Sequence, residues 1–205
     1  MSVSLLTDGP AEAASTIVLA HGAGAPMDSP FMNRIALGLT ERDLRVVRFE
    51  FPYMAGRREG RRRPPDPPKV LLDTWREVIT GLGGGARLVV GGKSLGGRMA
   101  SMIADEVGAR GLVILGYPFH PPGKPEKTRV AHLATLGTPT LVLQGTRDAL
   151  GDRDEVPSYQ LSPSIRVVWL ENGDHSFKPR AKSGRSESQN LSEAIDEIAR
   201  FTAAL

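Results

Sequence analysis

The chain contains no cysteine, so disulfide bonds and thiolate metal sites are excluded. No apolar run approaches the roughly 18 residues that a membrane-spanning helix needs. The N-terminus also lacks a basic region before an apolar stretch, and the apolar segment 17–20 is too short for the core of a secretory signal. We therefore expect a cytoplasmic protein without a membrane partner.

Aromatic residues make up only 5% of the sequence. Nucleic-acid binding by base stacking needs aromatic side chains interleaved with basic ones, and no such pattern is present. The four histidines are scattered and lack the spacing of metal ligands: His21, His120, His132 and His175. The sequence thus predicts no nucleic-acid partner, no metal and no organic cofactor.

The chain has a composition suited to a folded core, with 205 residues of which 40% are hydrophobic and 24% charged. Its length predicts one domain spanning 1–205. Short apolar runs alternate with amphipathic stretches, which is typical of a parallel sheet covered by helices on both faces. The runs that we expect to form strands are 16–20, 44–49, 87–90, 111–115, 140–144 and 165–170.

Helices are expected between these strands, from 30 to about 42, from near 68, from 94 to about 107, and in the apolar stripe 191–205. The stretch 52–68 is rich in proline, glycine and arginine and is predicted to be a long surface loop. Only one short helix, near 129–136, fits between the strands at 111 and 140. That spacing predicts a mostly parallel sheet of six or seven strands without a helical cap domain.

The strongest motif is the G-x-S-x-G pattern at residues 92–96, with Ser94 at its centre. It follows an apolar strand directly and opens a helix, which is the strand–turn–helix setting of a nucleophile elbow. Gly92 and Gly96 leave room where side chains would clash. A phosphate-binding loop is excluded, because the glycine that it requires five residues before the second one is replaced by Arg87.

Two residues at the ends of later strands complete a candidate catalytic set with Ser94. His175 follows the strand 165–170 and can serve as the base, while Asp148 follows the strand 140–144 and can orient it. Asp174 is a poorer candidate because adjacent side chains usually diverge. The chain order serine, aspartate, histidine is the order of α/β-hydrolases.

A glycine-rich turn follows the strand 16–20 and contains Gly22, Ala23 and Gly24. Small residues let backbone N–H groups face a developing oxyanion. We expect the donors to be the N–H groups of Ala23 and of Leu95, the residue after the nucleophile. His21 is expected to shape this turn by hydrogen bonding.

The segments HGAGA, GGKSLGG, GTRD and GDHSF together resemble the small, capless α/β-hydrolases of the dienelactone-hydrolase-like type. The branch that this chain resembles contains bacterial predicted hydrolases and testis-expressed hydrolase-like proteins, and the resemblance extends from about residue 15 to the end. It implies the α/β-hydrolase fold, the Ser-His-Asp triad and acyl-hydrolase chemistry, but no particular substrate. Dienelactone hydrolases proper have a cysteine nucleophile, whereas position 94 is serine.

Two basic clusters lie in predicted loops, one at 57–63 and one comprising Lys178, Arg180, Lys182 and Arg185. They either give the pocket mouth a positive field that attracts an anionic acyl substrate, or form solvated loops. Substrate contacts are expected from Gly22, Gly24, Lys93, Phe119 and His120.

The sequence therefore predicts a serine hydrolase that acts on small carboxylic esters or thioesters through an acyl-enzyme. The alternative is a non-catalytic binding or scaffold protein on the same fold. The sequence does not indicate the oligomeric state.

Overall fold

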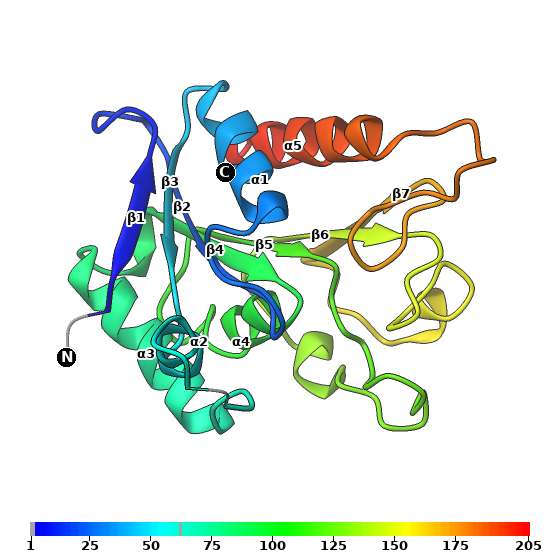
Figure 1. The fold of residues 1–205 in the computed structure, drawn as a ribbon, viewed down its shortest axis with the longest axis horizontal. Helices are drawn as coiled ribbons and strands as arrows, with labels where there is room; N and C mark the ends of the chain where they lie inside the picture. Colours follow the sequence, from blue (N-terminus) through cyan, green and yellow to red (C-terminus); the bar gives the residue numbers. More distant parts are fainter. Residues whose placement is uncertain (1–2, 62) are drawn as a thin grey trace.

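The computed structural model describes residues 3–61 and 63–205. Its centre is a seven-stranded sheet with the order β1-β3-β2-β4-β5-β6-β7 (Figure 1). The strands are β1 (Leu5–Asp8), β2 (Thr16–Ala20), β3 (Arg45–Phe49), β4 (Leu88–Lys93), β5 (Gly111–Leu115), β6 (Thr140–Gly145) and β7 (Ile165–Leu170). All neighbouring strands run parallel except β1, which pairs antiparallel with β3.

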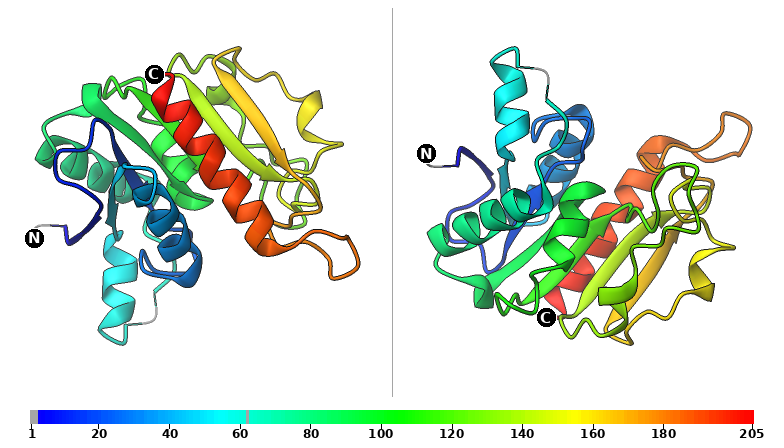
Figure 2. Two further views of the ribbon diagram at one scale, coloured as in Figure 1. Left: turned by 90° about the horizontal axis from the view of Figure 1, so that it is seen from above. Right: turned by 90° about the horizontal axis from the view of Figure 1, so that it is seen from below.

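Helices cover both faces of the sheet (Figure 2). One face carries α1 (Pro30–Thr40) and α5 (Glu187–Ala203), and the other carries α3 (Pro68–Gly81) and α4 (Leu95–Ser101) beside α2 (Pro52–Arg58). The described residues also form three 3₁₀ turns: η1 (Gly85–Arg87), η2 (Ala131–Ala134) and η3 (Val156–Ser158). A separate apolar core fills the space on each side of the sheet, so β2 to β6 are buried on both faces, whereas the edge strands β1 and β7 are only partly buried.

The predicted fold class is confirmed, and all six expected strands are present within a few residues of their expected bounds. Strand β1 was missed because it is a four-residue edge strand with alternating exposure instead of an apolar run. The helix that begins after Ser94 is shorter than expected. The backbone N–H groups of Met102 and Ile103 donate to the carbonyls three residues earlier, as in a 3₁₀ helix. The chain then turns at Gly108, whose φ is 59°.

The prediction of an irregular loop over 52–68 was wrong in its first half, where α2 forms. Pro52 occupies the first turn of this helix, where proline is compatible with helical geometry, and Tyr53 and Met54 are buried against the core. Residue 62, within the arginine-rich segment 57–63, lies outside the described residues.

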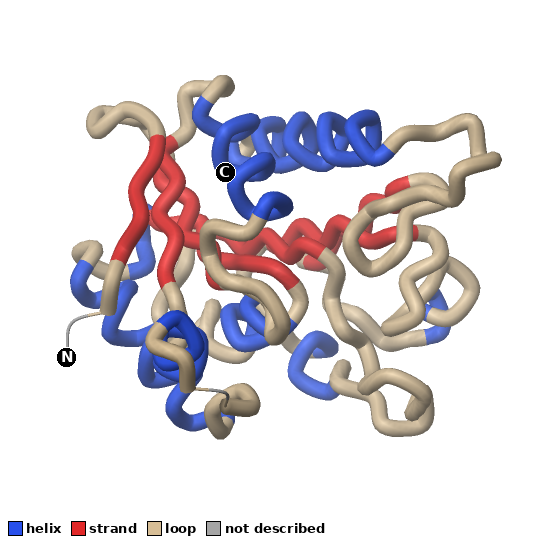
Figure 3. The backbone as a smooth tube through the Cα atoms, in the orientation of Figure 1, coloured by secondary structure: helices blue, strands red, loops and turns tan. Residues whose placement is uncertain are grey.

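The segment between β5 and β6 is mostly loop with the single turn η2, as Figure 3 shows. None of the helices in the described ranges combines the length and apolarity that a bilayer-spanning segment requires. Because β2 to β7 run parallel, the loops that follow β2, β4, β6 and β7 all begin at the same edge of the sheet.

Candidate active site

Ser94 lies at the end of β4, on a tight turn that opens α4. Its φ of 50° and ψ of −110° are unusual for a residue with a side chain. The turn requires glycine nearby, because a Cβ on Gly92 or Gly96 would lie 2.2 Å and 2.5 Å from the carbonyl oxygen of Ala20. Strand β2 and helix α4 can therefore approach each other only without side chains at these two positions.

The hydroxyl of Ser94 belongs to a continuous hydrogen-bonded chain. His175 Nε2 lies 2.8 Å from Ser94 Oγ, and His175 Nδ1 lies 2.7 Å from Asp148 Oδ2. An ionised carboxylate only accepts hydrogen bonds, so Nδ1 carries the proton and Nε2 is free to accept from the serine hydroxyl. The structure thus brings together three residues that are separated by up to 81 positions in the sequence.

Asp148 is completely buried and accepts two further hydrogen bonds. Its Oδ2 accepts from Gln144 Nε2 at 2.9 Å, and its Oδ1 accepts from the N–H of Leu150 at 2.9 Å. Gln144 also bonds both backbone groups of Tyr117, and so ties the end of β6 to the segment after β5. Sequence reasoning missed Gln144, although a glutamine that ends an otherwise apolar strand is a visible signal.

The loop 171–178 carries His175 and is held close to the sheet. Asp174 Oδ1 accepts from the N–H groups of Ser176 and Lys178, so this carboxylate shapes the loop, whereas the imidazole bonds Asp148 and Ser94. At the start of α5, Asn190 donates to the carbonyl of Phe177 at 2.7 Å. A side chain at Gly145 would collide with the loop, because its Cβ would lie 2.4 Å from the carbonyl oxygen of Asp174.

The turn after β2 presents backbone donors beside Ser94. The carbonyl of Gly22 accepts from His21 Nδ1 at 2.7 Å and from the Tyr53 hydroxyl at 3.3 Å. In a trans peptide the C=O and N–H groups point in opposite directions, so the N–H of Ala23 is directed away from His21 and Tyr53. In the described part of the chain this N–H has no acceptor.

A second free donor comes from Leu95, the first residue of α4, because the first N–H groups of a helix lack intrahelical acceptors. A Cβ on Gly22 would lie 3.8 Å from Cβ of Ser94, which shows how near this turn is to the serine. The two N–H groups therefore have the character of an oxyanion hole next to the hydroxyl.

His21 is fully buried beneath the turn and acts as a structural link. Its Nε2 accepts from the N–H of Phe51 at 3.1 Å, so Nδ1 must carry the proton that is donated to Gly22. Burial lowers the pKa of His21, which favours the neutral form that this pattern requires. The expectation that His21 shapes the turn agrees with these contacts.

Ser94 and His175 open into a cleft of about 350 Å³. Both Gly22 and Gly24 line it, as expected, and so does Lys93. Most of the remaining wall is apolar. The other lining residues are Ala23, Ala25, Ser29, Phe31, Met32, Leu150 and Ser176.

Lys93, at the end of β4, contacts both the loop that carries His175 and helix α1. Its Nζ donates to the carbonyl of His175 at 2.6 Å and lies 5.6 Å from the ring centre of Phe31. Gly116 provides the space, since a Cβ there would lie 3.1 Å from the ammonium nitrogen. Burial lowers the pKa of Lys93 to about 8, although the charges of Asp148 and Asp174 oppose this shift.

The structure corrects two of the expected substrate contacts. Phe119 is fully buried between Tyr117 and Tyr159, and does not line the cleft. His120 is 4% exposed and bonds the carbonyl of Pro121 and the carboxylate of Glu155. Both residues follow β5 as expected, but their side chains are buried in contacts with other residues and do not line the cleft at Ser94.

Several arginines of the two basic clusters are engaged within the protein. Arg57 donates to the carbonyls of Ala23 and Arg63, and Arg58 pairs with Glu50 and Asp28. Arg61 and Arg185 pair with Glu59 and Glu193. None of these arginines lines the cleft. Among the described residues that do line it, Lys93 is the only lysine or arginine.

A second serine–histidine pair lies at the other end of α4. Ser101 Oγ is 2.9 Å from His132 Nε2, but the hydroxyl also donates to the carbonyl of Arg98. No carboxylate of the described residues bonds His132, and neither residue lines the cleft. This pair therefore lacks the orienting acid and the free donors that surround Ser94. In the described ranges, no group of three or more histidines and carboxylates is placed to hold a metal ion.

Comparison with solved structures supports the same architecture. An α/β serine hydrolase homologue from Coxiella burnetii has 18% sequence identity and a TM-score of 0.74, with coverage of 97% of this chain and 90% of the other. A serine hydrolase without a lid from Xanthomonas campestris has 18% identity and a TM-score of 0.67 over 99% and 91% of the two chains. A dienelactone hydrolase from Anabaena variabilis has 21% identity and a TM-score of 0.71 over 98% and 91%.

At these identities the likeness concerns the fold. The family itself is shown by the sequence, because a family model described as an alpha/beta hydrolase domain matches residues 13–203. The match spans β2 to α5 and includes every residue of the Ser94 site. The chain therefore belongs to the alpha/beta hydrolase family.

Proposed function

We propose that this protein is a serine hydrolase that cleaves carboxylic ester or thioester bonds through a covalent acyl-enzyme. The observation that carries the proposal is the hydrogen-bonded chain from Ser94 through His175 to Asp148, next to two free backbone N–H groups in one cleft. A scaffold protein would have no need of a buried carboxylate aligned on an imidazole in this way.

The reaction follows from the positions of these groups. Ser94 Oγ attacks the acyl carbonyl carbon while His175 Nε2 takes the hydroxyl proton, and Asp148 stabilises the resulting imidazolium. The N–H groups of Ala23 and Leu95 bind the oxyanion. The imidazolium then protonates the leaving alkoxide or thiolate, and a water molecule activated by the same imidazole releases the acid and restores Ser94.

A fluorophosphonate probe tests this proposal directly. We expect the wild-type protein to be labelled on Ser94, as located by peptide mass spectrometry, and the Ser94→Ala variant to take up no label. The S101A variant is the matched control and should be labelled like the wild type. A well-folded wild-type protein that takes up no label would favour the scaffold alternative.

The cleft also suggests which esters are preferred. Its walls are largely apolar, and among the described residues the ammonium of Lys93 donates one hydrogen bond, to the carbonyl of His175. An ammonium has three donors, so two remain for a ligand. An acyl group of a few carbons that ends in a carboxylate would fill the apolar part of the cleft and accept from Lys93.

We predict that 4-nitrophenyl hemisuccinate has a KM about tenfold lower than 4-nitrophenyl butyrate at pH 7. A hydrogen bond to a charged group contributes about 1.5 kcal/mol or more, which corresponds to roughly tenfold in affinity. The pKa of Lys93 is about 8, so its charge is present below that pH and the preference should fade as the pH rises through it. Steady-state kinetics with both esters from pH 6.5 to 9 measure this.

Two variants separate the effect of Lys93 from that of the exposed basic loop. Lys93→Met should abolish the preference for the hemisuccinate, and Lys178→Met should retain it, because Lys178 is exposed and does not line the cleft. Equal KM values for the two esters in the wild type at pH 7 would refute the anionic preference, but would leave the hydrolase proposal intact.

A further inference from the structure

The tip of the loop that carries the oxyanion donor has few means of fixing its own shape. It consists of Gly24 and Ala25, which follow Ala23, and both residues are exposed. A Cβ at Gly24 would have no neighbour within 4 Å. The N–H of Ala23 must nevertheless stay in place, because a preorganised donor is what stabilises an oxyanion.

Groups on both sides of this tip are bonded to the end of β3 and to α2. Before the tip, the carbonyl of Ala23 accepts from the Tyr53 hydroxyl and from Arg57, each at 3.2 Å. After the tip, the N–H of Met27 donates to Glu50 Oε1 at 3.2 Å, and its carbonyl accepts from Arg48 at 2.9 Å. The loop is therefore anchored twice, at the positions that flank its unsupported part.

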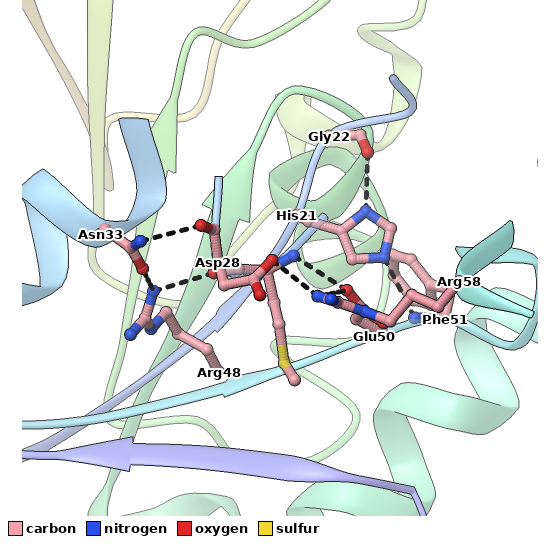
Figure 4. Close-up of polar contacts among 9 residues, drawn as sticks. His21, Gly22, Asp28, Asn33, Arg48, Glu50, Phe51 and Arg58 are labelled. Atoms are coloured by element: carbon pink, nitrogen blue, oxygen red, sulfur yellow. Dashed lines mark hydrogen bonds and ion pairs between the residues drawn. The ribbon is translucent and has the colours of Figure 1, made fainter. Parts of the chain in front are cut away.

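The anchor after the tip belongs to a network of charged side chains (Figure 4). Arg58 donates to Glu50 through Nε at 2.8 Å and through Nη2 at 2.6 Å, and its Nη2 also donates to Asp28 Oδ1 at 2.6 Å. One guanidinium thus binds the carboxylate that holds Met27 and the side chain of the next loop residue. Glu50 is 7% exposed, so its carboxylate depends on this partner for compensation of its charge.

A second arginine, Arg48 on β3, also belongs to this network of charged side chains. Arg48 is 3% exposed and donates to Asn33 at 2.6 Å and to Asp8 at 2.7 Å, as well as to Met27. Asn33 in turn donates to the carbonyl of Asp28 at 2.8 Å. Strand β3, helix α1 and edge strand β1 are in this way all connected to the segment 27–28.

We infer that Glu50 and Arg58 are positioning residues, whose ion pair fixes the loop 22–28 so that the N–H of Ala23 remains directed at the reacting carbonyl oxygen. The inference rests on the proposed function, because it assigns these residues a role in that reaction. Neither residue lines the cleft, so neither touches the substrate. Their effect is transmitted through Met27, Asp28 and the loop tip.

The experiment compares Arg58→Met and Glu50→Gln with the wild type. Both variants keep the volume of the side chain and remove the charge. We expect kcat to fall about tenfold to a hundredfold with KM nearly unchanged, since the oxyanion contact is made in the transition state. The upper value of a hundredfold is the lower end of the cost of losing one complete oxyanion donor, about 10²–10³, because these variants displace the donor and do not remove it.

Comparing kcat for an ester with kcat for the corresponding thionoester gives a ratio that a general structural defect would leave unchanged. Sulfur in a C=S group is a weaker acceptor than carbonyl oxygen, so the oxo/thiono ratio of kcat reports on the oxyanion donors. We expect this ratio to fall in Arg58→Met and Glu50→Gln, and to recover partly in Arg58→Lys, which can pair with one of the two carboxylates.

Arg76→Met is the matched control. Arg76 makes the same kind of two-point pair with Glu106, at 2.7 Å and 2.8 Å, but lies far along the chain from the loop and binds none of its residues. Its oxo/thiono ratio should equal that of the wild type. An unchanged ratio in folded Arg58→Met and Glu50→Gln would overturn the inference, whereas a wild-type protein without esterase activity and without probe labelling would overturn the proposed function itself.

Should Glu50→Gln unfold, Asp28→Asn offers a milder test at an exposed carboxylate of the same network. It retains the Glu50–Arg58 pair and weakens the second bond of Arg58. We expect a smaller decrease of the same ratio, and no decrease would count against the inference.

Discussion

The Ser94→Ala variant should lose nearly all catalysis, with kcat for 4-nitrophenyl butyrate reduced by about 10⁶-fold, as in triad enzymes whose nucleophile is removed. The reason is that the covalent path requires the hydroxyl that lies 2.8 Å from His175 Nε2. The Ser94→Ala/His175→Ala double variant should be no slower than either single variant, because the two residues act as one unit. Stopped assays at high enzyme concentration measure the residual rates.

Ser101→Ala is the control for this series, because Ser101 ends α4, the helix that follows Ser94, and also bonds a histidine. It should retain the wild-type kcat. Circular dichroism and thermal denaturation establish that each variant is folded. A Ser94→Ala variant within tenfold of the wild type, or a Ser101→Ala variant that loses activity while folded, would show that the cleft at Ser94 is not the reacting site.

The Asp148→Asn variant should lower kcat by about 10⁴-fold while leaving the fold intact. The carboxylate is buried and accepts from His175 Nδ1, Gln144 and the N–H of Leu150. An amide in its place can present a donor to Nδ1, which favours the tautomer in which Nε2 carries the proton. That tautomer cannot accept the proton of Ser94.

Asp174→Asn is the control for Asp148→Asn. The Oδ1 of asparagine can accept the same hydrogen bonds from Ser176 and Lys178, so the variant should keep most of the wild-type kcat. Steady-state kinetics at pH 7 to 9 measure both variants. If Asp174→Asn were the more damaging of the two, the assignment of Asp148 as the orienting acid would be wrong.

Much of the fold could be predicted because it is encoded in local patterns. Six strands are visible as apolar runs, and five of them, β2 to β6, are buried on both faces, where no alternation is needed. The edge strand β1 has no such run, and α2 is obscured by the proline, glycine and arginine that surround it. In both segments the structure depends on what packs against the chain: β3 pairs with β1, and the core accepts Tyr53 and Met54.

In the candidate site too, some features follow from local sequence patterns and others depend on tertiary packing. Ser94, Asp148 and His175 could be named because each follows a predicted strand at one edge, and parallel strands bring those ends together. Phe119 and His120 satisfy the same rule, yet neither lines the cleft, because a position after a strand does not fix side-chain direction. Gln144 and the Glu50–Arg58 pair were missed because their partners are distant in the sequence or lie on the next element.

The amino-acid sequence alone therefore specified the order of the elements, the glycines that the elbow requires and the identity of the three residues in the hydrogen-bonded chain, because these follow from short-range sterics and strand order. Tertiary structure decided the contents of the cleft, the protonated nitrogen of His21, and the ion pairs behind the loop at Ala23. These features depend on angles and distances between elements, and packing of the whole core sets them.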